Sequence, residues 1–233
     1  MMTDKQIIID GVDADCKVIM DKYINQIINA DCLDILKQLP DKCIDLVLTD
    51  PPYGIDYTGQ VEHKCTEGKN GWRKMEYKQW DNDTLNANQV NEIFRVSKNQ
   101  ILWGGNYFAN LLPNSQCWLV WNKGQRNFSL ADGELAWTSF DKALRIFDYA
   151  RAKQLNAEVR QHPTQKPLAL FSWCLEKFSK ENDLILDCFS GSGTTAIACH
   201  NLKRRFICIE KDYDYYKASV ERLKDAQSQL KLF

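Results

Sequence analysis

The sequence predicts an α/β fold built on a parallel sheet, and two observations support this prediction. Short runs rich in isoleucine, leucine and valine alternate with longer amphipathic stretches, most clearly in the second half of the chain, as expected for alternating strands and helices. The runs are apolar throughout, which is typical of strands that helices cover on both faces. With 233 residues, of which 44% are hydrophobic, we expect residues 1–233 to form a single domain.

The first half of the chain contributes four expected strands and two expected helices. Each strand is a run of apolar residues, and each helix carries its apolar side chains on one face. The strands are expected at Asn25–Ala30, Cys43–Thr49, Gln100–Trp103 and Cys117–Trp121, and the helices at Leu33–Leu39 and Leu85–Ser97. Residues 54–83 are polar and contain several glycines. A connection of this length is usually functional, so we predict a mobile substrate loop there.

The second half has the clearer pattern. A helix is expected first, and a strand, a helix, a strand and a final helix follow it in alternation. The expected bounds are Pro167–Lys180, Asp183–Cys188, Thr194–Asn201, Arg205–Glu210 and Asp212–Leu230. The pattern is weak before Tyr23 and between Asn122 and Arg160, where we assign no elements.

The composition excludes some classes of protein and leaves others open. The 30 basic and 31 acidic residues give a net charge of −1, so a nucleic-acid partner would require basic side chains gathered on one face. No apolar run approaches the ~20 residues of a membrane span, and the N-terminus lacks the pattern of a signal peptide. We therefore expect a cytoplasmic protein with no membrane partner.

Cysteine and histidine usage argues against a metal site. The nine cysteines include no Cys-x-x-Cys pair, and only three histidines are present. No spacing typical of zinc ligands occurs. We expect reduced thiols that are buried as small hydrophobic side chains, and no bound metal.

A glycine-rich turn follows the expected strand that ends near Asp187. In residues 184–199 (LILDCFSGSGTTAIAC), the glycines let the backbone bend sharply and approach a ligand before a helix begins. The next strand ends in Glu210, whose carboxylate can accept both hydroxyls of a ribose. This combination favours a nucleoside-like cofactor over the alternative, a packing turn beside a surface glutamate. A phosphate-binding loop is disfavoured because no Gly-Lys-Ser/Thr follows.

The segment Thr49–Gly54 (TDPPYG) follows an expected strand directly. Two prolines stiffen the backbone and hold the Asp50 carboxylate and the Pro51 carbonyl in a fixed relation. Two such acceptors can bind the hydrogens of an exocyclic amine and make its nitrogen lone pair available for reaction. The Tyr53 ring can stack on a base that has left a duplex. The alternative is a rigid turn with a solvent-facing aspartate.

Three motifs resemble those of DNA amino-methyltransferases. Asp50–Tyr53 (DPPY) resembles their catalytic motif, and Asp187–Gly193 (DCFSGSG) resembles their S-adenosylmethionine motif, usually written Phe-x-Gly-x-Gly. His162–Pro167 (HPTQKP) resembles the motif that leads into the helix before it. The catalytic motif comes first, which is the order of the β group of this family. The resemblance covers the chain from about Asn25 to Leu223.

The resemblance implies a fold, a cofactor and two sets of site residues. The fold would be the Rossmann-like seven-stranded methyltransferase sheet, circularly permuted so that strand Cys43–Thr49 lies beside strand Asp183–Cys188. The implied catalytic residues are Asp50, Pro51, Pro52 and Tyr53. The implied S-adenosylmethionine ligands are Asp31, Thr164, Lys166, Asp187, Phe189, Ser190, Gly191, Gly193, Thr194 and Glu210. Of these, Asp31 could equally be only a helix cap, and no metal is required.

Basic side chains beside aromatic ones are candidates for DNA contacts. Within the predicted loop we select Lys69, Arg73 and Lys74, and further along the chain Lys123 and Arg126. Each could equally belong to a solvated face. Residues 122–160 lie where the family often carries target recognition, so a small recognition insertion is predicted there. The implied partner is double-stranded DNA with the target base flipped out, and a homodimer is left open.

The aspartate at the head of the catalytic motif favours adenine N6 as the methylated atom. Cytosine N4 is the alternative that keeps the same mechanism. Methylation of RNA or of a protein amide is disfavoured because those enzymes carry the cofactor motif first. A DNA-binding regulator without turnover would have no need of the Asp50 and Tyr53 pair. The sequence therefore predicts an adenine-N6 DNA methyltransferase of the kind found in restriction-modification systems.

Overall fold

The computed structural model describes residues 20–55, 84–126, 131–150, 153 and 165–228. They form a single eight-stranded sheet with the strand order β1-β8-β7-β2-β3-β5-β4-β6. The strands are β1 (Gln26–Asn29), β2 (Ile44–Thr49), β3 (Ser97–Trp103), β4 (Trp118–Asn122), β5 (Gly133–Thr138), β6 (Arg145–Asp148), β7 (Leu184–Asp187) and β8 (Arg205–Glu210). The helices are α2 (Cys32–Leu36), α3 (Ala87–Val96), the short 3₁₀ helix η2 (Ala109–Leu111), α5 (Leu168–Phe178), α6 (Thr194–Asn201) and α7 (Tyr213–Ser228).

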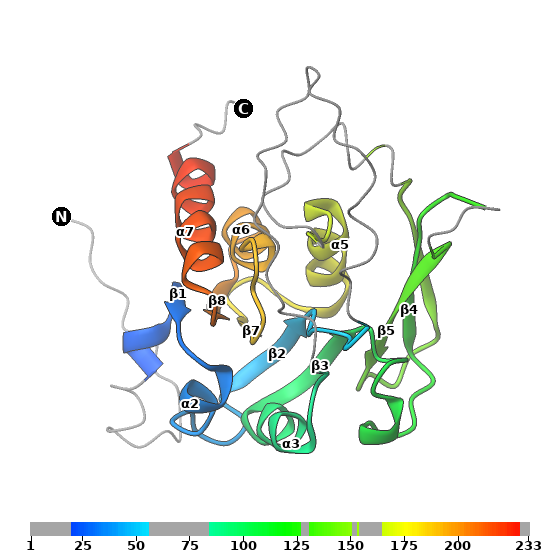
Figure 1. The fold of residues 1–233 in the computed structure, drawn as a ribbon, viewed down its shortest axis with the longest axis horizontal. Coiled ribbons are helices and arrows are strands. Elements are labelled where there is room, and N and C mark those ends of the chain that lie inside the picture. Colours follow the sequence, from blue (N-terminus) through cyan, green and yellow to red (C-terminus); the bar gives the residue numbers. More distant parts are fainter. Residues whose placement is uncertain (1–19, 56–83, 127–130, 151–152, 154–164, 229–233) are drawn as a thin grey trace.

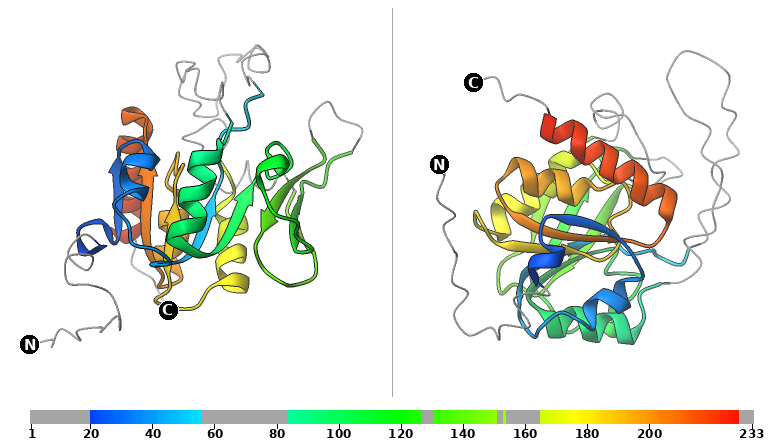
Figure 2. Two further views of the ribbon diagram at one scale, coloured as in Figure 1. Left: turned by 90° about the horizontal axis from the view of Figure 1, so that it is seen from below. Right: turned by 90° about the vertical axis from the view of Figure 1, so that its left-hand side faces the viewer.

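Helices cover the sheet on both faces. Figures 1 and 2 show α5, α6 and α7 on one face and α2 and α3 on the other. One hydrophobic core lies on each face, with Leu46 and Ile185 in the first and Val47 and Leu186 in the second. The central strands β2 and β7 are therefore buried on both sides, which is why their sequences are apolar without alternation.

The five strands from β1 to β3 are all parallel, whereas β5 is antiparallel to both of its neighbours. Strand β2 lies beside β7, with Leu46 opposite Ile185 and Val47 opposite Leu186. This adjacency confirms the circularly permuted order expected from the sequence. It also brings the ends of β2 and β7, and the residues that follow them, to one edge of the sheet.

Most expected elements are present, with shifts at their ends. Helix α6 and strand β8 have the expected bounds. Helix α3 begins later than expected because Asn86 caps it, with a reciprocal capping box to Gln89. Strands β5 and β6 lie in the stretch that we left unassigned. Strand β6 adds an eighth strand at the edge of the sheet, one more than expected, and most of its side chains are exposed, so no apolar pattern marks it.

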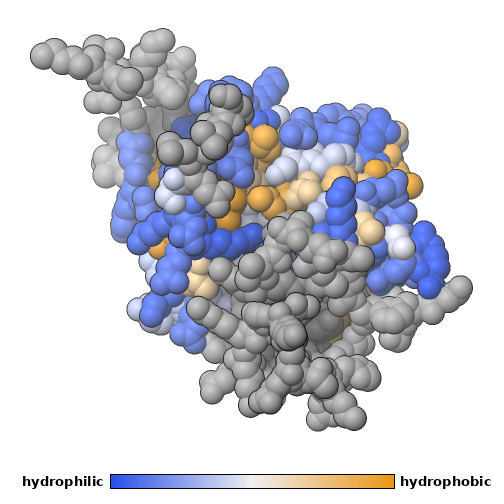
Figure 3. All heavy atoms as spheres, turned by 90° about the horizontal axis from the view of Figure 1, so that it is seen from above, coloured by the Kyte–Doolittle hydropathy of each residue, from blue (hydrophilic) through white to orange (hydrophobic). Residues whose placement is uncertain are grey.

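Among the described residues no helix is long and apolar enough to cross a membrane. On the face drawn in Figure 3, hydrophilic side chains cover most of the described surface, and hydrophobic ones form smaller patches between them. The large hydrophobic side chains that are exposed include Leu144 and Ile146, which lie in or next to the edge strand β6.

Candidate active-site cleft

A cleft of about 860 Å³ opens where the parallel strands of the sheet end. Its walls come from the residues that follow β1, β2, β7 and β8, and from the segment that leads into α5. This is the carboxyl edge of the sheet, where ligands of open α/β sheets bind. The predicted site residues that line the cleft are Asp31, Asp50, Pro52, Lys166, Asp187, Phe189, Ser190, Gly191, Thr194 and Glu210.

The glycine-rich turn that follows β7 is held in place from two sides. Gly191 and Gly193 both have positive φ angles, 48° and 75°, which side chains disfavour. A Cβ atom on Gly193 would lie 3.0 Å from the Cβ atom of Ser219 in α7. The backbone N–H of Gly191 donates a hydrogen bond to Glu210 Oε2 over 2.7 Å. The turn therefore packs tightly against α7 and is tied to the acid at the end of β8.

Two acids at the ends of neighbouring strands line one end of the cleft. Glu210 also accepts a hydrogen bond from the Asp212 N–H over 2.8 Å, and burial raises the pKa of its carboxyl although both N–H donors act against the shift. Each of its oxygens keeps lone-pair capacity for a further donor. Asp31 caps α2 through the Leu33 N–H over 3.0 Å and pairs with Lys211 over 3.0 Å. Asp31 therefore caps α2 and also lines the cleft.

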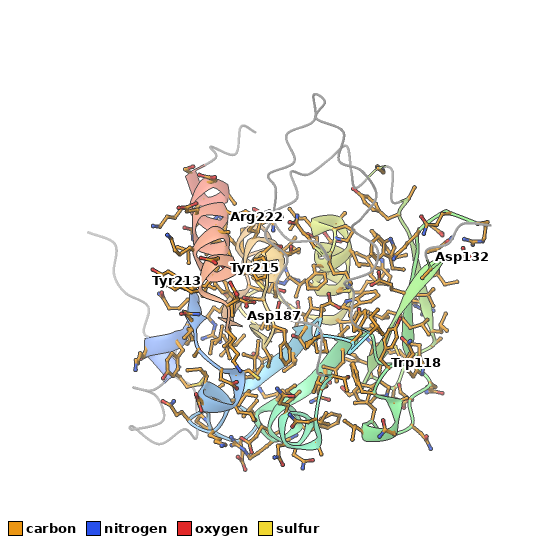
Figure 4. The ribbon with its side chains drawn as sticks, viewed as in Figure 1. Trp118, Asp132, Asp187, Tyr213, Tyr215 and Arg222 are labelled. Atoms are coloured by element: carbon orange, nitrogen blue, oxygen red, sulfur yellow. The ribbon has the colours of Figure 1, made fainter. Side chains whose placement is uncertain are left out.

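Asp187 is the most enclosed acid of the cleft. Its carboxylate accepts hydrogen bonds from the Thr49 hydroxyl over 2.6 Å, the Phe189 N–H over 3.1 Å and the Thr195 hydroxyl. Burial raises the pKa of this carboxyl to about 6, against the effect of these three donors. Tyr215 of α7 lines the same cleft, and Figure 4 shows both residues.

The raised pKa of Asp187 makes the stability of the fold depend on pH. Between about pH 4 and pH 6 the folded chain holds a proton on this group that the unfolded chain has lost, so the free energy of unfolding falls as pH rises. From the ordinary pKa of 3.8 to about 6, the loss amounts to roughly 3 kcal/mol. Because Asp187→Asn lacks this titration, its stability relative to wild type should rise by that amount across the window. Urea unfolding at several pH values measures the difference, and a constant difference would contradict the prediction.

The Asp-Pro-Pro-Tyr segment begins directly after β2. The Asp50 side chain is 17% exposed and both of its oxygens accept hydrogen bonds. Oδ1 accepts from the Tyr53 hydroxyl over 2.6 Å, and Oδ2 accepts from the Lys166 ammonium over 2.5 Å. Burial raises the pKa of Asp50, while the charge of Lys166 opposes that shift. Burial and the nearby Asp50 carboxylate raise the pKa of Tyr53 well above its usual value, so its hydroxyl remains a donor.

The ammonium of Lys166 lies at the catalytic motif, whereas its backbone carbonyl accepts a hydrogen bond from the Thr194 hydroxyl, just after the glycine turn, over 3.5 Å. Its ammonium contacts Glu134 Oε2 over 3.0 Å and the Tyr53 hydroxyl over 3.1 Å, in addition to Asp50. Glu134 in turn pairs with Lys123 over 2.5 Å. Sequence analysis missed Glu134 because it lies in β5, which we did not assign. The alternation in residues 133–138 (GELAWT) could have indicated a strand, but nothing local indicates the partner of the glutamate.

The Tyr53 ring is supported from behind. It stacks on Tyr107, with ring centroids 4.6 Å apart and planes at 15°. Gly104, which follows β3 with a φ of 71°, lets the ring approach its backbone: a Cβ atom there would lie 2.0 Å from Tyr53 Cε1. The position of the tyrosine therefore depends on a glycine and an aromatic side chain that the sequence motifs do not include.

The structure describes only some of the residues that the sequence predicts for the site and for DNA contacts. Lys69, Arg73, Lys74 and Thr164 lie outside the described residues. The ammonium of Lys123 is largely buried against Glu134, so it is poorly placed to contact a phosphate. Arg126 is 59% exposed and lies 3.8 Å from Asp132. Of the two described candidates, Arg126 is the one that solvent and a backbone phosphate can reach.

Comparison with known proteins gives one family match. A family model described as DNA methylase, named for N6 and N4 methyltransferases, matches residues 72–221, which is more than half of the chain. The chain is 27% identical over 252 residues to the type II methyltransferase M.HinfI of Haemophilus influenzae, covering 87% of this chain and 69% of that protein. It is 28% identical over 262 residues to the type II methyltransferase M2.MboI of Moraxella bovis, covering 91% of each.

A solved structure shares the fold. The crystal structure of the M1.HpyAVI–SAM complex superposes with a TM-score of 0.56 at 24% identity, covering 85% of this chain and 98% of that chain. This likeness supports the α/β fold described above. Because the family model spans residues 72–221, which include β7, the glycine turn and β8, the chain belongs to the family of N6 and N4 DNA methylases.

Proposed function

We propose that this DNA amino-methyltransferase transfers a methyl group from S-adenosylmethionine to N6 of adenine in double-stranded DNA. One observation supports this proposal above all others. Asp50, which heads the catalytic motif, and the glycine turn after β7 line the same cleft although they are more than 130 residues apart in sequence. A methyl donor in the turn and an amine at Asp50 would therefore meet in one cavity.

The cleft fits S-adenosylmethionine in size and in chemistry. Its volume of about 860 Å³ is within the range of ligand pockets, roughly 300–1,000 Å³. Glu210 would accept the ribose hydroxyls, Asp31 would lie toward the adenine, and Asp187 with the glycine turn would hold the ribose and methionine part. Ser190 Oγ is buried and has no hydrogen-bond partner among the described residues, as expected of a polar group that a ligand satisfies.

The catalytic motif prepares the amine for reaction. When bound, the cofactor supplies an electrophilic methyl group on its sulfonium. The lone pair of an exocyclic amine is delocalised into the base and reacts poorly. The Asp50 carboxylate and the Pro51 carbonyl would accept its two N–H bonds and draw the nitrogen toward tetrahedral geometry, while Tyr53 stacks on the base. Rate enhancement would come mainly from this positioning of the amine against the methyl group.

The choice between the two bases is a proposal of its own. The aspartate at the head of the motif supports adenine. Cytosine N4 is the second candidate, because its amine presents the same two N–H bonds and the family model is named for both products. We further propose that the loop residues Lys69, Arg73 and Lys74, together with Arg126, contact DNA phosphates, and that residues 122–160 contribute to target recognition.

The test is methyl transfer from labelled S-adenosylmethionine to unmethylated genomic DNA, followed by digestion and analysis of the nucleosides. N6-methyladenine is the expected product. N4-methylcytosine would replace the proposed base while keeping the mechanism. Absence of any modified base, from an enzyme shown to bind the cofactor and supplied with DNA of varied composition, would refute the proposed activity. Parallel assays with single-stranded DNA and RNA test the preference for duplex DNA.

The proposed stacking role of Tyr53 gives a sharp prediction at Gly104. In Gly104→Ala the new Cβ atom would overlap the Tyr53 ring, since their separation would be 2.0 Å. We expect the turnover number to fall about 100-fold, the usual effect of a displacement near 1 Å in an active site, with cofactor affinity unchanged. Single-turnover kinetics and calorimetry measure the two quantities.

A second glycine provides the matched control. Gly124 has a similar φ of 64°, but a Cβ atom there would meet Ala150 at 3.4 Å, an ordinary contact. Gly124→Ala carries the same backbone strain without displacing an aromatic ring. Because it lies in the proposed recognition segment, the comparison is made at saturating DNA, where its turnover should stay near that of the wild type. Equal turnover in both variants would mean that the ring position of Tyr53 does not limit the reaction.

A further inference from the structure

Four charged side chains form a continuous chain of ion pairs behind the catalytic motif. Lys166 pairs with Asp50 over 2.5 Å and with Glu134 over 3.0 Å, and Glu134 pairs with Lys123 over 2.5 Å. They come from four separate places: after β2, before α5, in β5 and after β4. The Lys166 side chain is only 6% exposed. Two carboxylates and two ammonium groups are thus enclosed together with no net charge.

Stability alone does not explain this arrangement. Removing charges from water is costly, and buried ion pairs can often be replaced by hydrophobic side chains without loss of stability. The network also does not merely join two surface elements, since one of its members is the aspartate of the Asp-Pro-Pro-Tyr motif. The role of Lys166 and Glu134 therefore concerns the charge and the hydrogen bonds of Asp50.

The charge state of Asp50 depends on its neighbours. The groups that face it are Lys166, the Tyr53 hydroxyl, Glu134 and, from β7, Asp187. Burial raises the pKa of Asp50, Lys166 lowers it and Glu134 raises it again. Without Lys166, Glu134 would keep Lys123 as its partner, but Asp50 would lose its ammonium partner and retain Glu134 as a like charge, which favours protonation of Asp50. A protonated Asp50 is a weaker acceptor for an amine.

The hydrogen bonds of Asp50 also place Lys166 where a substrate must act. Oδ1 is bonded to Tyr53 and Oδ2 to Lys166. An amine that donates to Oδ2 must share this oxygen with the ammonium or displace it. Glu134 lies 3.0 Å from the same ammonium. Burial alone would raise the pKa of the Glu134 carboxyl, but its two lysine partners lower that pKa to about 2. Glu134 therefore remains ionised, and it can keep the Lys166 ammonium paired when that ammonium no longer contacts Asp50 Oδ2.

We propose that Lys166 is a positioning residue that keeps Asp50 ionised and binds its Oδ2 until the amine of the target base takes that place, while Glu134 retains the Lys166 ammonium. This inference rests on the proposed methyl transfer to a base. It differs from the role implied by the family resemblance, in which Lys166 is a ligand of S-adenosylmethionine. The two roles predict different results for the same variant.

The decisive variant is Lys166→Met, which keeps most of the length of the side chain and removes its ammonium group. Asp50 must be ionised to act, so a raised pKa means that activity is low below that pKa and recovers as pH rises. Removing the opposite charge raises the pKa of Asp50 further, so we expect the rising limb of the kcat–pH profile to move by about 1–3 pH units to higher pH, with kcat below that of wild type at low pH and recovering as pH rises. Affinity for S-adenosylmethionine should stay within about twofold of wild type, a change below 0.5 kcal/mol.

Two further variants keep the inference testable if Lys166→Met folds poorly. In Glu134→Gln, Lys166 has lost its second carboxylate and is held by Asp50 alone, so we expect kcat to fall about 10-fold with no upward shift of the pH profile. The double variant Lys166→Met with Glu134→Gln removes the like charge and should return the profile toward that of the wild type. Lys98→Met is the matched control, because it removes the lysine of another Asp–Lys pair. Lys98 lies 2.7 Å from Asp45, which is near the start of β2 and therefore at the end away from the cleft. This variant should change neither kcat nor its pH profile.

The outcomes separate this inference from the proposed function. If the wild-type enzyme methylates no base, the proposed function fails. If the wild type is active and Lys166→Met keeps its rate and pH profile, or loses cofactor affinity with an unshifted profile, Lys166 does not act through Asp50. Wild-type kcat in Glu134→Gln would likewise overturn the role of Glu134.

Discussion

Replacing Asp50 with alanine should abolish methyl transfer while leaving the binding of S-adenosylmethionine nearly intact. In the proposed mechanism the carboxylate is the charged acceptor for the amine, and an electrostatic group of this kind contributes about 100-fold to 1,000-fold or more to the rate. The cofactor contacts proposed here come from other strands, at Asp187 and Glu210, so Asp50→Ala removes none of them. The fold should also survive, because the buried Lys166 ammonium keeps Glu134 as an ion-pair partner over 3.0 Å when Asp50 is removed.

Single-turnover methylation and calorimetric titration of the cofactor together measure this effect. Asp50→Asn keeps the shape of the side chain but not its charge, and we expect it to be nearly as inactive as the alanine variant. Asp41→Ala is a suitable control, since Asp41 is 75% exposed and pairs with Arg95 far from the cleft. Retained turnover in Asp50→Ala would exclude Asp50 as the acceptor of the amine.

Asp187→Ala should cause the largest loss of stability among the cleft residues. Three donors point at this carboxylate, the hydroxyls of Thr49 and Thr195 and the N–H of Phe189. Alanine would leave all three without an acceptor in an enclosed place, and each unsatisfied buried group costs about 1–3 kcal/mol. We expect the free energy of unfolding to fall by roughly 3–5 kcal/mol, before any effect on the cofactor.

Urea unfolding of the cofactor-free protein measures this loss directly. Asp187→Asn retains an acceptor oxygen for part of the network and should lose much less stability than the alanine variant. Asp132→Ala, at a position 55% exposed in the β4–β5 connection and labelled in Figure 4, should change the free energy of unfolding by no more than about 0.5 kcal/mol. Similar stability of Asp187→Ala and Asp132→Ala would mean that the three donors find other partners.

The parts of the site that the sequence predicted well are contiguous in the chain. The run from β7 through the glycine turn to α6 and β8 has a local logic, because a strand end, a turn that needs glycine and a helix start follow one another directly. The Asp-Pro-Pro-Tyr segment is likewise a strand end with a fixed backbone. The structure places both segments in the cleft, as their positions after parallel strands require. The permuted sheet that brings them together came from the resemblance to a family and is confirmed by the pairing of β2 with β7.

What the sequence by itself determined, then, is the α/β class, the family motifs and the elements whose apolar pattern is strong. Only the tertiary structure decided which charges meet. Glu134 lies 32 residues before Lys166 and 84 residues after Asp50 in sequence, and its strand β5 has no pattern that names a partner. The stacking of Tyr107 on Tyr53 and the close approach of Gly104 arise in the same way. Periodicity reports which face of an element is buried, but contacts between side chains of distant elements depend on how the strands are ordered and how closely they pack.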